Sequence, residues 1–244
     1  MIDLHAHILP GLDDGARTED EMRLLLREAA HAGFQTIVCT PHCTEHSFLT
    51  PDAIMGALAA ALAAVWQESC ALQLCPGSEV DSFCVTPHNL LAGRILSLCG
   101  SGYVLMELPR TALVDISEDL KALRTGGFVP VIAHPERYVY VQQAPSLALS
   151  WVEGGALLQC NFASLLRAYG KRAQQTVELL LSHRLVHFLA SDAHHPRTVY
   201  PSVQEARGRA VRLSDETYVD ALTERNPAEV LANRLFQPQG YRPL

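Results

Sequence analysis

Short apolar or β-branched runs alternate with helix-like stretches along almost the whole chain, and this alternation limits the folds that are open to it. The runs that have the length and composition of strands are Ile2–His7, Gln35–Thr40, Leu72–Gly77, Tyr103–Leu108, Phe128–Ala133, Ala156–Cys160 and Val186–Ala190. Strands that alternate with helices indicate a parallel sheet, and an uninterrupted series of such units favours a β/α barrel. The sequence therefore predicts an α/β fold of about seven parallel strands, the barrel class whose active sites lie at one rim.

The stretches between these runs carry helix signals. Thr18 and Glu21 fit a capping box, and Gly33 is a suitable stop for the helix that follows them. Thr50-Pro51 opens a second helix, because proline is tolerated in a first turn. Further helices are expected near Asp115–Thr125, Ser146–Glu153, Lys171–Ser182 and Pro201–Ala210. No linker, repeat or low-complexity segment divides the 244 residues, so we expect a single domain over residues 1–244.

Composition excludes several classes of protein. The longest apolar stretch, Ala57 to Trp66, is too short to cross a bilayer, and no basic region precedes an apolar one at the N-terminus. Seven cysteines without a C-x-x-C pair suggest neither a disulfide framework nor a thiolate zinc site. A net charge of −7 argues against nucleic-acid binding. These features favour a cytoplasmic protein that does not insert into a membrane; whether it forms a homo-oligomer is left open.

Side chains that can ligate a hard metal recur at or just after the ends of the predicted strands. They are His5, His7, Asp14, His42, Glu79, Glu107, His134, Asp192 and His194. The first strand alternates with period two, so the histidines of His5-Ala6-His7 project from one face and can reach a common ion. Asp192-Ala193-His194 is a second unit of similar form after an apolar run. Two such units together are far more specific than one.

In a parallel barrel these positions all lie on the rim where active sites form. Taken alone, Glu107 could be a buried ion-pair partner, Asp14 a turn residue and His42 a loop histidine. Their joint placement on one rim favours a metal centre. The remaining histidines lack this placement and are interpreted as surface or core residues, although His46 and His195 lie in loops next to candidate ligands.

Five segments resemble the PHP (polymerase and histidinol phosphatase) superfamily in order along the chain. They are Met1–Gly15, Thr40-Pro41-His42, Gly77-Ser78-Glu79, Ala133–Tyr138 and Ser191–His194. Within that superfamily the chain is most similar to the manganese-dependent protein-tyrosine phosphatases of capsule and exopolysaccharide clusters, the CpsB/YwqE-like type. The resemblance implies a distorted TIM-like barrel, a centre of two to three ions and hydrolysis of phosphotyrosine on the tail of a bacterial tyrosine kinase that controls polysaccharide export.

The resemblance also implies roles for single residues. The nine candidate ligands take the ligand positions of the family, with Glu79 as the bridging carboxylate and Asp13 as an alternative to Asp14. Arg137 and Arg197 resemble its phosphate-holding arginines. The resemblance makes Mn²⁺ the expected metal. Histidine mixed with carboxylate also suits Fe²⁺ or Zn²⁺, and Mg²⁺ is a further alternative.

The ligand set indicates the chemistry. Clustered divalent ions bind phosphoryl oxygens and lower the pKa of a water molecule, which supplies a hydroxide nucleophile near neutral pH. A tyrosine phenolate leaves readily, because the pKa of its conjugate acid is only about 10. We therefore expect a preference for aryl phosphates, with the substrate ring lying over a shallow rim against Tyr138 or Phe48.

Rival functions are a PHP phosphatase for a small metabolite such as histidinol phosphate, a phosphodiesterase, and a metal-binding protein that regulates a kinase by docking. Cysteine-based catalysis is excluded, because no cysteine is followed by arginine six places later, as the Cys-x₅-Arg loop requires. A Walker loop is also absent from the sequence.

Overall fold

The structure is a computed structural model that describes residues 1–67, 71–235 and 240–242. The described residues form nine strands, all in parallel pairs. The strands are β1 (Ile2–Ala6), β2 (Thr36–Cys39), β3 (His42–Cys43), β4 (Gln73–Pro76), β5 (Glu79–Asp81), β6 (Tyr103–Glu107), β7 (Val129–Ala133), β8 (Leu157–Asn161) and β9 (Phe188–Ala190). All seven predicted strands are present, which confirms the parallel α/β class.

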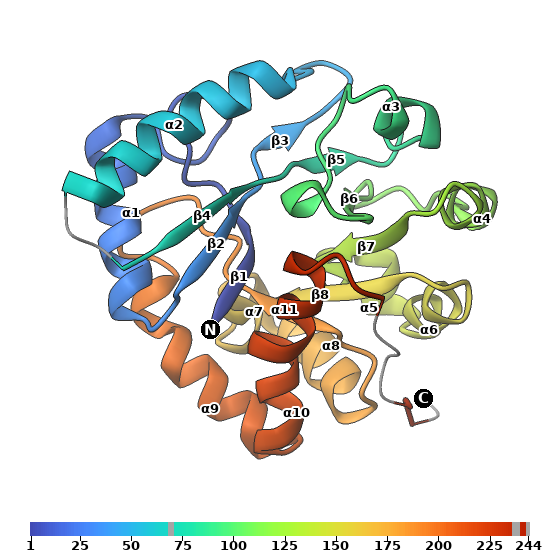
Figure 1. The fold of residues 1–244 in the computed structure, drawn as a ribbon. Coiled ribbons are helices and arrows are strands. Elements are labelled where there is room, and N and C mark those ends of the chain that lie inside the picture. Colours follow the sequence, from blue (N-terminus) through green and yellow to red (C-terminus); the bar gives the residue numbers. More distant parts are fainter. Residues whose placement is uncertain (68–70, 236–239, 243–244) are drawn as a thin grey trace.

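Helices lie outside the strands on every side in Figure 1, from α2 at the upper left through α4 at the right to α9 and α10 below. The α-helices are α1 (Glu19–His31), α2 (Pro51–Gln67), α3 (Pro87–Leu91), α4 (Ser117–Thr125), α5 (Val139–Gln143), α6 (Ser146–Glu153), α7 (Phe162–Leu165), α8 (Gly170–Ser182), α9 (Val203–Leu213), α10 (Glu216–Asp220) and α11 (Asn226–Leu231). Short turns of 3₁₀-helix, η1 (Leu98–Gly100), η2 (Pro135–Arg137) and η3 (Tyr200–Ser202), and one of π-helix, η4 (Ala221–Arg225), join them. None of the described helices combines the length and apolarity that a membrane span needs.

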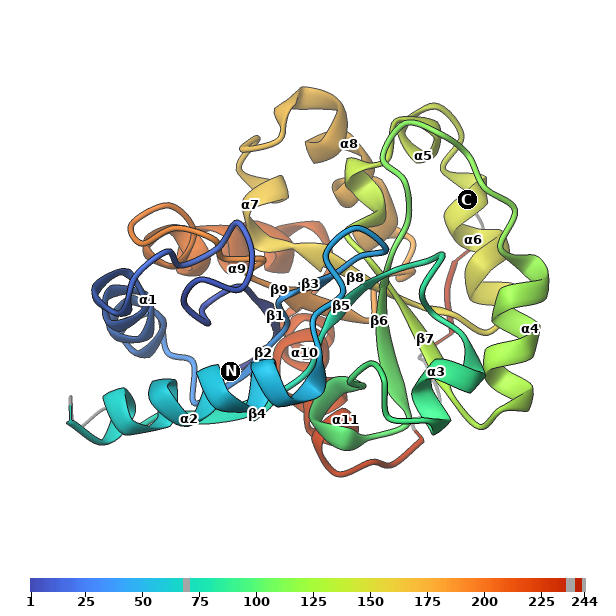
Figure 2. The same cartoon turned by 90° about the horizontal axis from the view of Figure 1, so that it is seen from above.

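The strands divide into two sheets whose edges meet. One sheet has the order β1-β2-β4 and the other the order β3-β5-β6-β7-β8-β9. The chain passes from the first to the second at Thr40-Pro41 and again at Gly77-Ser78. The far edge of the second sheet returns to β1, where the Asp192 amide donates to the His5 carbonyl (2.8 Å) and the His7 amide to the Ala193 carbonyl (2.9 Å). Figure 2 shows the strands from above, with β9 beside β1. This arrangement is a distorted form of the predicted barrel.

The sequence analysis missed β3 and β5. Each has only two or three residues, and each follows residues that interrupt an apolar pattern, Pro41 before β3 and Gly77-Ser78 before β5. The helix predicted at Pro201–Ala210 begins instead at Val203, after a turn of 3₁₀-helix, and extends to Leu213. Thr18 is confirmed as the N-cap, because its hydroxyl accepts a hydrogen bond from the Glu21 amide (3.2 Å). The Glu21 carboxylate accepts from the Arg17 amide (2.8 Å), one residue before the position that a capping box uses.

Alternate residues of the strands pack into two separate apolar clusters. In β6, Tyr103 and Leu105 belong to one cluster, while Val104 and Met106 belong to the other. Both faces of such a strand are therefore buried, as expected for a parallel sheet covered by helices. The face that starts with Tyr103 and Leu105 ends in a carboxylate, Glu107. This face of β6 thus becomes polar at the C-terminal end of the strand, whereas the face of Val104 and Met106 continues into the buried Leu108.

A close backbone approach in the loop after β1 gives a test of this arrangement. A Cβ atom at Gly15 would lie 2.1 Å from the His7 carbonyl oxygen, whereas one at Gly56 in α2 would meet nothing within 4 Å. Gly15→Ala should lower the free energy of unfolding by about 1–3 kcal/mol, the usual cost of overpacking. Gly56→Ala should raise it by about 0.5–1 kcal/mol, because alanine is the better helix former. Urea denaturation of both variants measures this, and equal effects would contradict the tight turn.

Candidate metal centre

The structure brings all nine predicted ligands to the C-terminal ends of the strands. They fall into three groups whose ligand atoms lie within 4.8 Å of one another: His5, Glu79, His134 and Asp192; His7, Asp14, His42 and His194; and His42, Glu79 and Glu107. The first group is fully buried, whereas Asp14 in the second has 72% of its side chain exposed. Residues almost 190 positions apart in the sequence therefore form one cluster, as the common rim predicted.

Glu79 is at the middle of this cluster. Its Oε2 atom lies 3.1 Å from His5 Nε2, 3.2 Å from His7 Nε2 and 3.1 Å from His42 Nδ1. Its Oε1 atom lies 2.8 Å from His134 Nε2. Glu79 begins β5 and is fully buried, so its position is fixed by the short strand that the sequence analysis missed. One carboxylate thus faces four imidazoles.

The tautomers of the two histidines on β1 and just after it show that the cluster fits metal ions. His5 Nδ1 faces the amide oxygen of Gln159 at 2.8 Å, and His7 Nδ1 faces the Asp13 carboxylate at 2.6 Å. Both acceptors require a proton on Nδ1 in a neutral ring, so both Nε2 atoms carry lone pairs. These two atoms lie 3.0 Å apart. Two nitrogens at about 2.1 Å from one ion and at right angles to each other have about this separation.

Two carboxylate oxygens support the same conclusion. Glu79 Oε2 and Asp192 Oδ1 are buried and have no hydrogen-bond donor. A buried charged oxygen without a partner is costly unless a cation binds it. Burial disfavours ionisation of Glu79, yet the neighbouring His5 and His134 hold the pKa of Glu79 well below its usual range. The pKa of Glu107 is raised by burial and by the charge of Glu79. This concentration of negative charge is matched to divalent ions.

Asp13 and Asp14, which the sequence did not distinguish, have different positions. Asp13 accepts hydrogen bonds from His7 Nδ1, from the Gly15 amide (2.9 Å) and from the His42 amide (3.0 Å). Its oxygens are therefore occupied in orienting His7 and His42. Asp14 Oδ1 lies 3.3 Å from His194 Nε2 and 3.5 Å from His42 Nε2, within the second group. The geometry favours Asp14 as the ligand and Asp13 as the residue that fixes the His7 tautomer.

Strand β8 contributes a buried amide relay that the sequence analysis missed. Gln159 accepts from His5 and donates from Nε2 to Asn161 Oδ1 (2.8 Å). Asn161 in turn donates from Nδ2 to Asp192 Oδ2 (2.6 Å). The relay connects two candidate ligands, and all of its members are buried. Glutamine and asparagine are not typical ligands, so the only available signal was two polar residues in a strand that is otherwise apolar.

Arg137 and Tyr169 border a cavity of about 440 Å³ that also contains Asp14, Asp192 and His194 in its wall. Arg137 donates from a terminal guanidinium nitrogen to Asp192 Oδ2 (2.5 Å), and its guanidinium carbon lies 4.3 Å from the centre of the Tyr169 ring. Its hydrogen-bond partner is therefore a candidate metal ligand. Burial, together with Asp192, raises the pKa of Tyr169 to about 12, so this phenol is neutral at physiological pH.

Other predicted contributors to the site lie elsewhere. Arg197 is exposed and does not line this cavity, whereas Arg110, which the sequence analysis overlooked, does. The expectation that Tyr138 faces the substrate is wrong. Its ring is fully buried, and its hydroxyl donates to the Ala133 carbonyl (2.7 Å) and accepts from the Leu108 amide (2.9 Å). Tyr138 therefore joins two strand ends instead of lining the rim.

Phe48, His195 and His187 differ in whether they line this cavity. Phe48 is 43% exposed but is not part of the cavity wall, whereas His195 is. His187 is a core residue as interpreted, with Nδ1 accepting from the Leu158 amide (3.0 Å).

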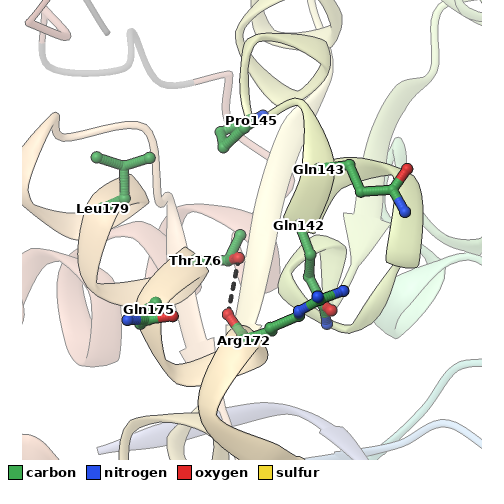
Figure 3. Close-up of a pocket in the computed structure, with 7 residues that line it drawn as sticks. All are labelled: Gln142, Gln143, Pro145, Arg172, Gln175, Thr176 and Leu179. Carbon is green, nitrogen blue, oxygen red and sulfur yellow. Dashed lines mark hydrogen bonds between the residues drawn. The ribbon is translucent and has the colours of Figure 1, made fainter.

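A second pocket, shown in Figure 3, lies between α5 and α8 and contains none of the candidate ligands. Its wall consists of Gln142, Gln143, Pro145, Arg172, Gln175, Thr176 and Leu179. Thr176 donates to the Arg172 carbonyl within α8 (2.9 Å), which is a local helix contact.

Comparison with known proteins defines the family. Residues 1–232 match the family described as capsular polysaccharide synthesis, CpsB/CapC. The chain therefore belongs to the CpsB/CapC family. It is 35% identical over 208 residues to the tyrosine-protein phosphatase YwqE of Bacillus subtilis. This alignment covers 84% of this chain and 82% of that protein. It is 27% identical to the tyrosine-protein phosphatase CpsB of Streptococcus pneumoniae, covering 97% of this chain and 100% of that protein.

Solved structures agree with the fold. One matching structure comes from a study of YwqE of Bacillus subtilis and CpsB of Streptococcus pneumoniae, which are described there as metal-dependent tyrosine phosphatases. Its TM-score is 0.94 at 31% sequence identity, and the match covers 100% of this chain and 99% of that one. A histidinol phosphate phosphatase from Lactococcus lactis has a TM-score of 0.55 at 11% identity, covering 88% of this chain and 95% of that one, which shows a shared fold alone.

The amide relay predicts an effect on ion binding. Gln159→Leu removes the acceptor that holds the His5 proton on Nδ1. The proton can then move to Nε2, where it would block the lone pair that ligates an ion. Loss of such an outer partner typically weakens metal binding about 10–100-fold. Titration calorimetry with Mn²⁺ measures the affinity, and Gln175→Leu, at an exposed glutamine of the second pocket, is the matched control. Unchanged affinity in Gln159→Leu would show that the relay does not position His5.

Proposed function

We propose that this protein is a metal-dependent protein-tyrosine phosphatase that acts on the phosphotyrosine tail of a bacterial tyrosine kinase in capsule or exopolysaccharide synthesis. The observation that carries the proposal is the convergence of nine ligand side chains beside Arg137 in a member of the CpsB/CapC family. We further propose a single domain, a cytoplasmic location and a centre of two to three ions, with Mn²⁺ preferred over Fe²⁺, Zn²⁺ or Mg²⁺.

The three ligand groups suggest how the chain holds these ions. His5, Glu79, His134 and Asp192 would hold one ion in the buried interior, and His7, Asp14, His42 and His194 would hold another nearer the cavity. Glu79 is common to the first and third groups, which supports its role as a bridge. When bound, clustered divalent ions bind phosphoryl oxygens and lower the pKa of a water molecule toward neutrality.

The residues of the chain supply the remaining functions. Gln159 and Asp13 hold the ring protons of His5 and His7 on Nδ1, so both Nε2 atoms stay free to ligate. Arg137 places positive charge beside Asp192, where the non-bridging oxygens of a phosphate would gain charge in the transition state. Because a phenolate is a good leaving group, the site has little need of a proton donor. This favours an aryl phosphate over an alkyl phosphate.

Cysteine chemistry does not contribute to the proposal. The buried thiols of Cys39, Cys43 and Cys160 have raised pKa values because burial disfavours the thiolate. A thiolate is the nucleophilic form of cysteine, so these residues are unsuited to attack phosphorus. Cys70 lies outside the described residues.

A comparison of substrates tests the function. The Mn²⁺-loaded protein should hydrolyse a phosphotyrosine peptide faster than a phosphoserine peptide or histidinol phosphate at equal concentration. A thymidine monophosphate ester reports phosphodiesterase activity. Exhaustive chelation should abolish turnover, and elemental analysis should give two to three ions per chain. Faster hydrolysis of histidinol phosphate would assign the protein to the metabolite phosphatases, and full activity after chelation would exclude the metal mechanism.

Arg137 provides a second test. Arg137→Ala should lower kcat/KM by about 10²- to 10³-fold, the usual effect of removing one preorganised donor. Asp192 keeps its hydrogen bond from Asn161, so metal content should persist in the variant. Arg137→Lys keeps the charge but loses the planar fork of the guanidinium, so its kcat/KM should lie between those of the wild type and Arg137→Ala. The metal content and melting temperature of each variant show whether a loss of activity comes from catalysis or from folding. Loss of ions in Arg137→Ala would make the arginine a support for Asp192.

A further inference from the structure

The wall of the cavity beside the metal centre combines two kinds of side chain. The charged and metal-ligating residues Asp192, His194 and Arg137 come from the loop after β9 and from η2. The segment from α7 to the start of α8 supplies Ala163, Ala168 and Tyr169 instead. These three side chains are small or aromatic, and none carries a charge. A ligand with one anionic part and one apolar part is therefore complementary to the cavity.

Tyr169 is placed where these two kinds of wall meet. Tyr169 is 37% exposed and lines the cavity, and the Arg137 guanidinium carbon lies 4.3 Å from the centre of its ring. Arg137 itself donates to Asp192, a candidate ligand. In an aryl phosphate only one ester oxygen separates the ring from phosphorus. A phosphate held between the metal centre and Arg137 would accordingly have its ring next to Tyr169.

We propose that Tyr169, with Ala163 and Ala168, forms the subsite for the aromatic ring of the substrate and so sets the preference for aryl over alkyl groups. This inference rests on the proposed function. Tyr138 is unavailable because it is buried, and Phe48 is outside the cavity wall. A contact between aromatic rings adds a modest gain beyond the area buried, equivalent to about 2- to 12-fold in binding. The cavity of about 440 Å³ has room for a tyrosyl phosphate and part of its backbone.

Binding of two phosphonates isolates this contact from leaving-group chemistry. Phenylphosphonate and methylphosphonate carry the same anionic group and differ in the ring, and neither is hydrolysed. Titration calorimetry with the Mn²⁺-loaded enzyme gives both dissociation constants for the wild type, Tyr169→Leu and Tyr169→Phe. Phe48→Leu is the matched control, because Phe48 is an exposed aromatic outside the cavity.

The wild type should bind phenylphosphonate more tightly than methylphosphonate. Tyr169→Leu should weaken phenylphosphonate about 3- to 10-fold and leave methylphosphonate within about 2-fold. Tyr169→Phe keeps the ring and should retain the selectivity, as should Phe48→Leu. Equal weakening of both ligands in Tyr169→Leu would overturn the proposal and make Tyr169 a support for Arg137. Unchanged selectivity in that variant would also overturn it.

The same preparation distinguishes failure of this inference from failure of the proposed function. If the wild type hydrolyses a phosphotyrosine peptide while Tyr169→Leu keeps its phosphonate selectivity, only the subsite assignment is wrong. If the metal-loaded wild type hydrolyses no aryl phosphate, the proposed function is wrong first, and the ring subsite is wrong with it.

Discussion

Carboxylate and imidazole side chains from several strands meet at one buried point, and their mutual repulsion must be offset for the chain to fold. Glu79 and Asp192 are buried carboxylates with oxygens that no donor satisfies, and two histidine nitrogens with lone pairs face each other 3.0 Å apart. Electrostatic repulsion of this kind destabilises a folded chain unless cations occupy the centre. Stability and chemistry are therefore linked. The groups that destabilise the folded chain when no ion is bound are the same groups that would bind the ions.

The fold limits this cost by concentrating it at one rim. In β6, the face of Tyr103 and Leu105 is apolar and becomes polar only at its C-terminal end, at Glu107. The apolar part is buried in the cluster below and stabilises the strand that presents the ligand. Strand β8 shows the same change along one face. The face begins with the apolar Leu157 and continues with Gln159 and Asn161, the two residues of the amide relay.

Sequence patterns predicted which side chains gather at the rim, because each pattern follows a simple rule of strand geometry or topology. His5 and His7 share a face by the period of a β-strand, and ligands at the ends of parallel strands meet by topology. The strands β3 and β5 were missed because two or three residues carry too little pattern. Tyr138 was misplaced because the direction of a side chain in a loop is decided by tertiary packing, here by hydrogen bonds to Ala133 and Leu108. Tyr169 was missed for the same reason, since nothing in its sequence surroundings indicates contact with Arg137.

Exposure rises from the interior of the centre toward the cavity, and this gradient separates two tasks. His5, Glu79, His134 and Asp192 are all buried, so an ion among them would be shielded from solvent and held by fixed groups. His42 and His194 are half-buried, and Asp14 is mostly exposed. Ligands that solvent reaches are also the ligands that a substrate reaches, and Asp14 and His194 do line the cavity with Arg137 and Tyr169. Under the proposed function, the buried group would anchor the centre, while the more exposed group would meet the phosphate beside Tyr169.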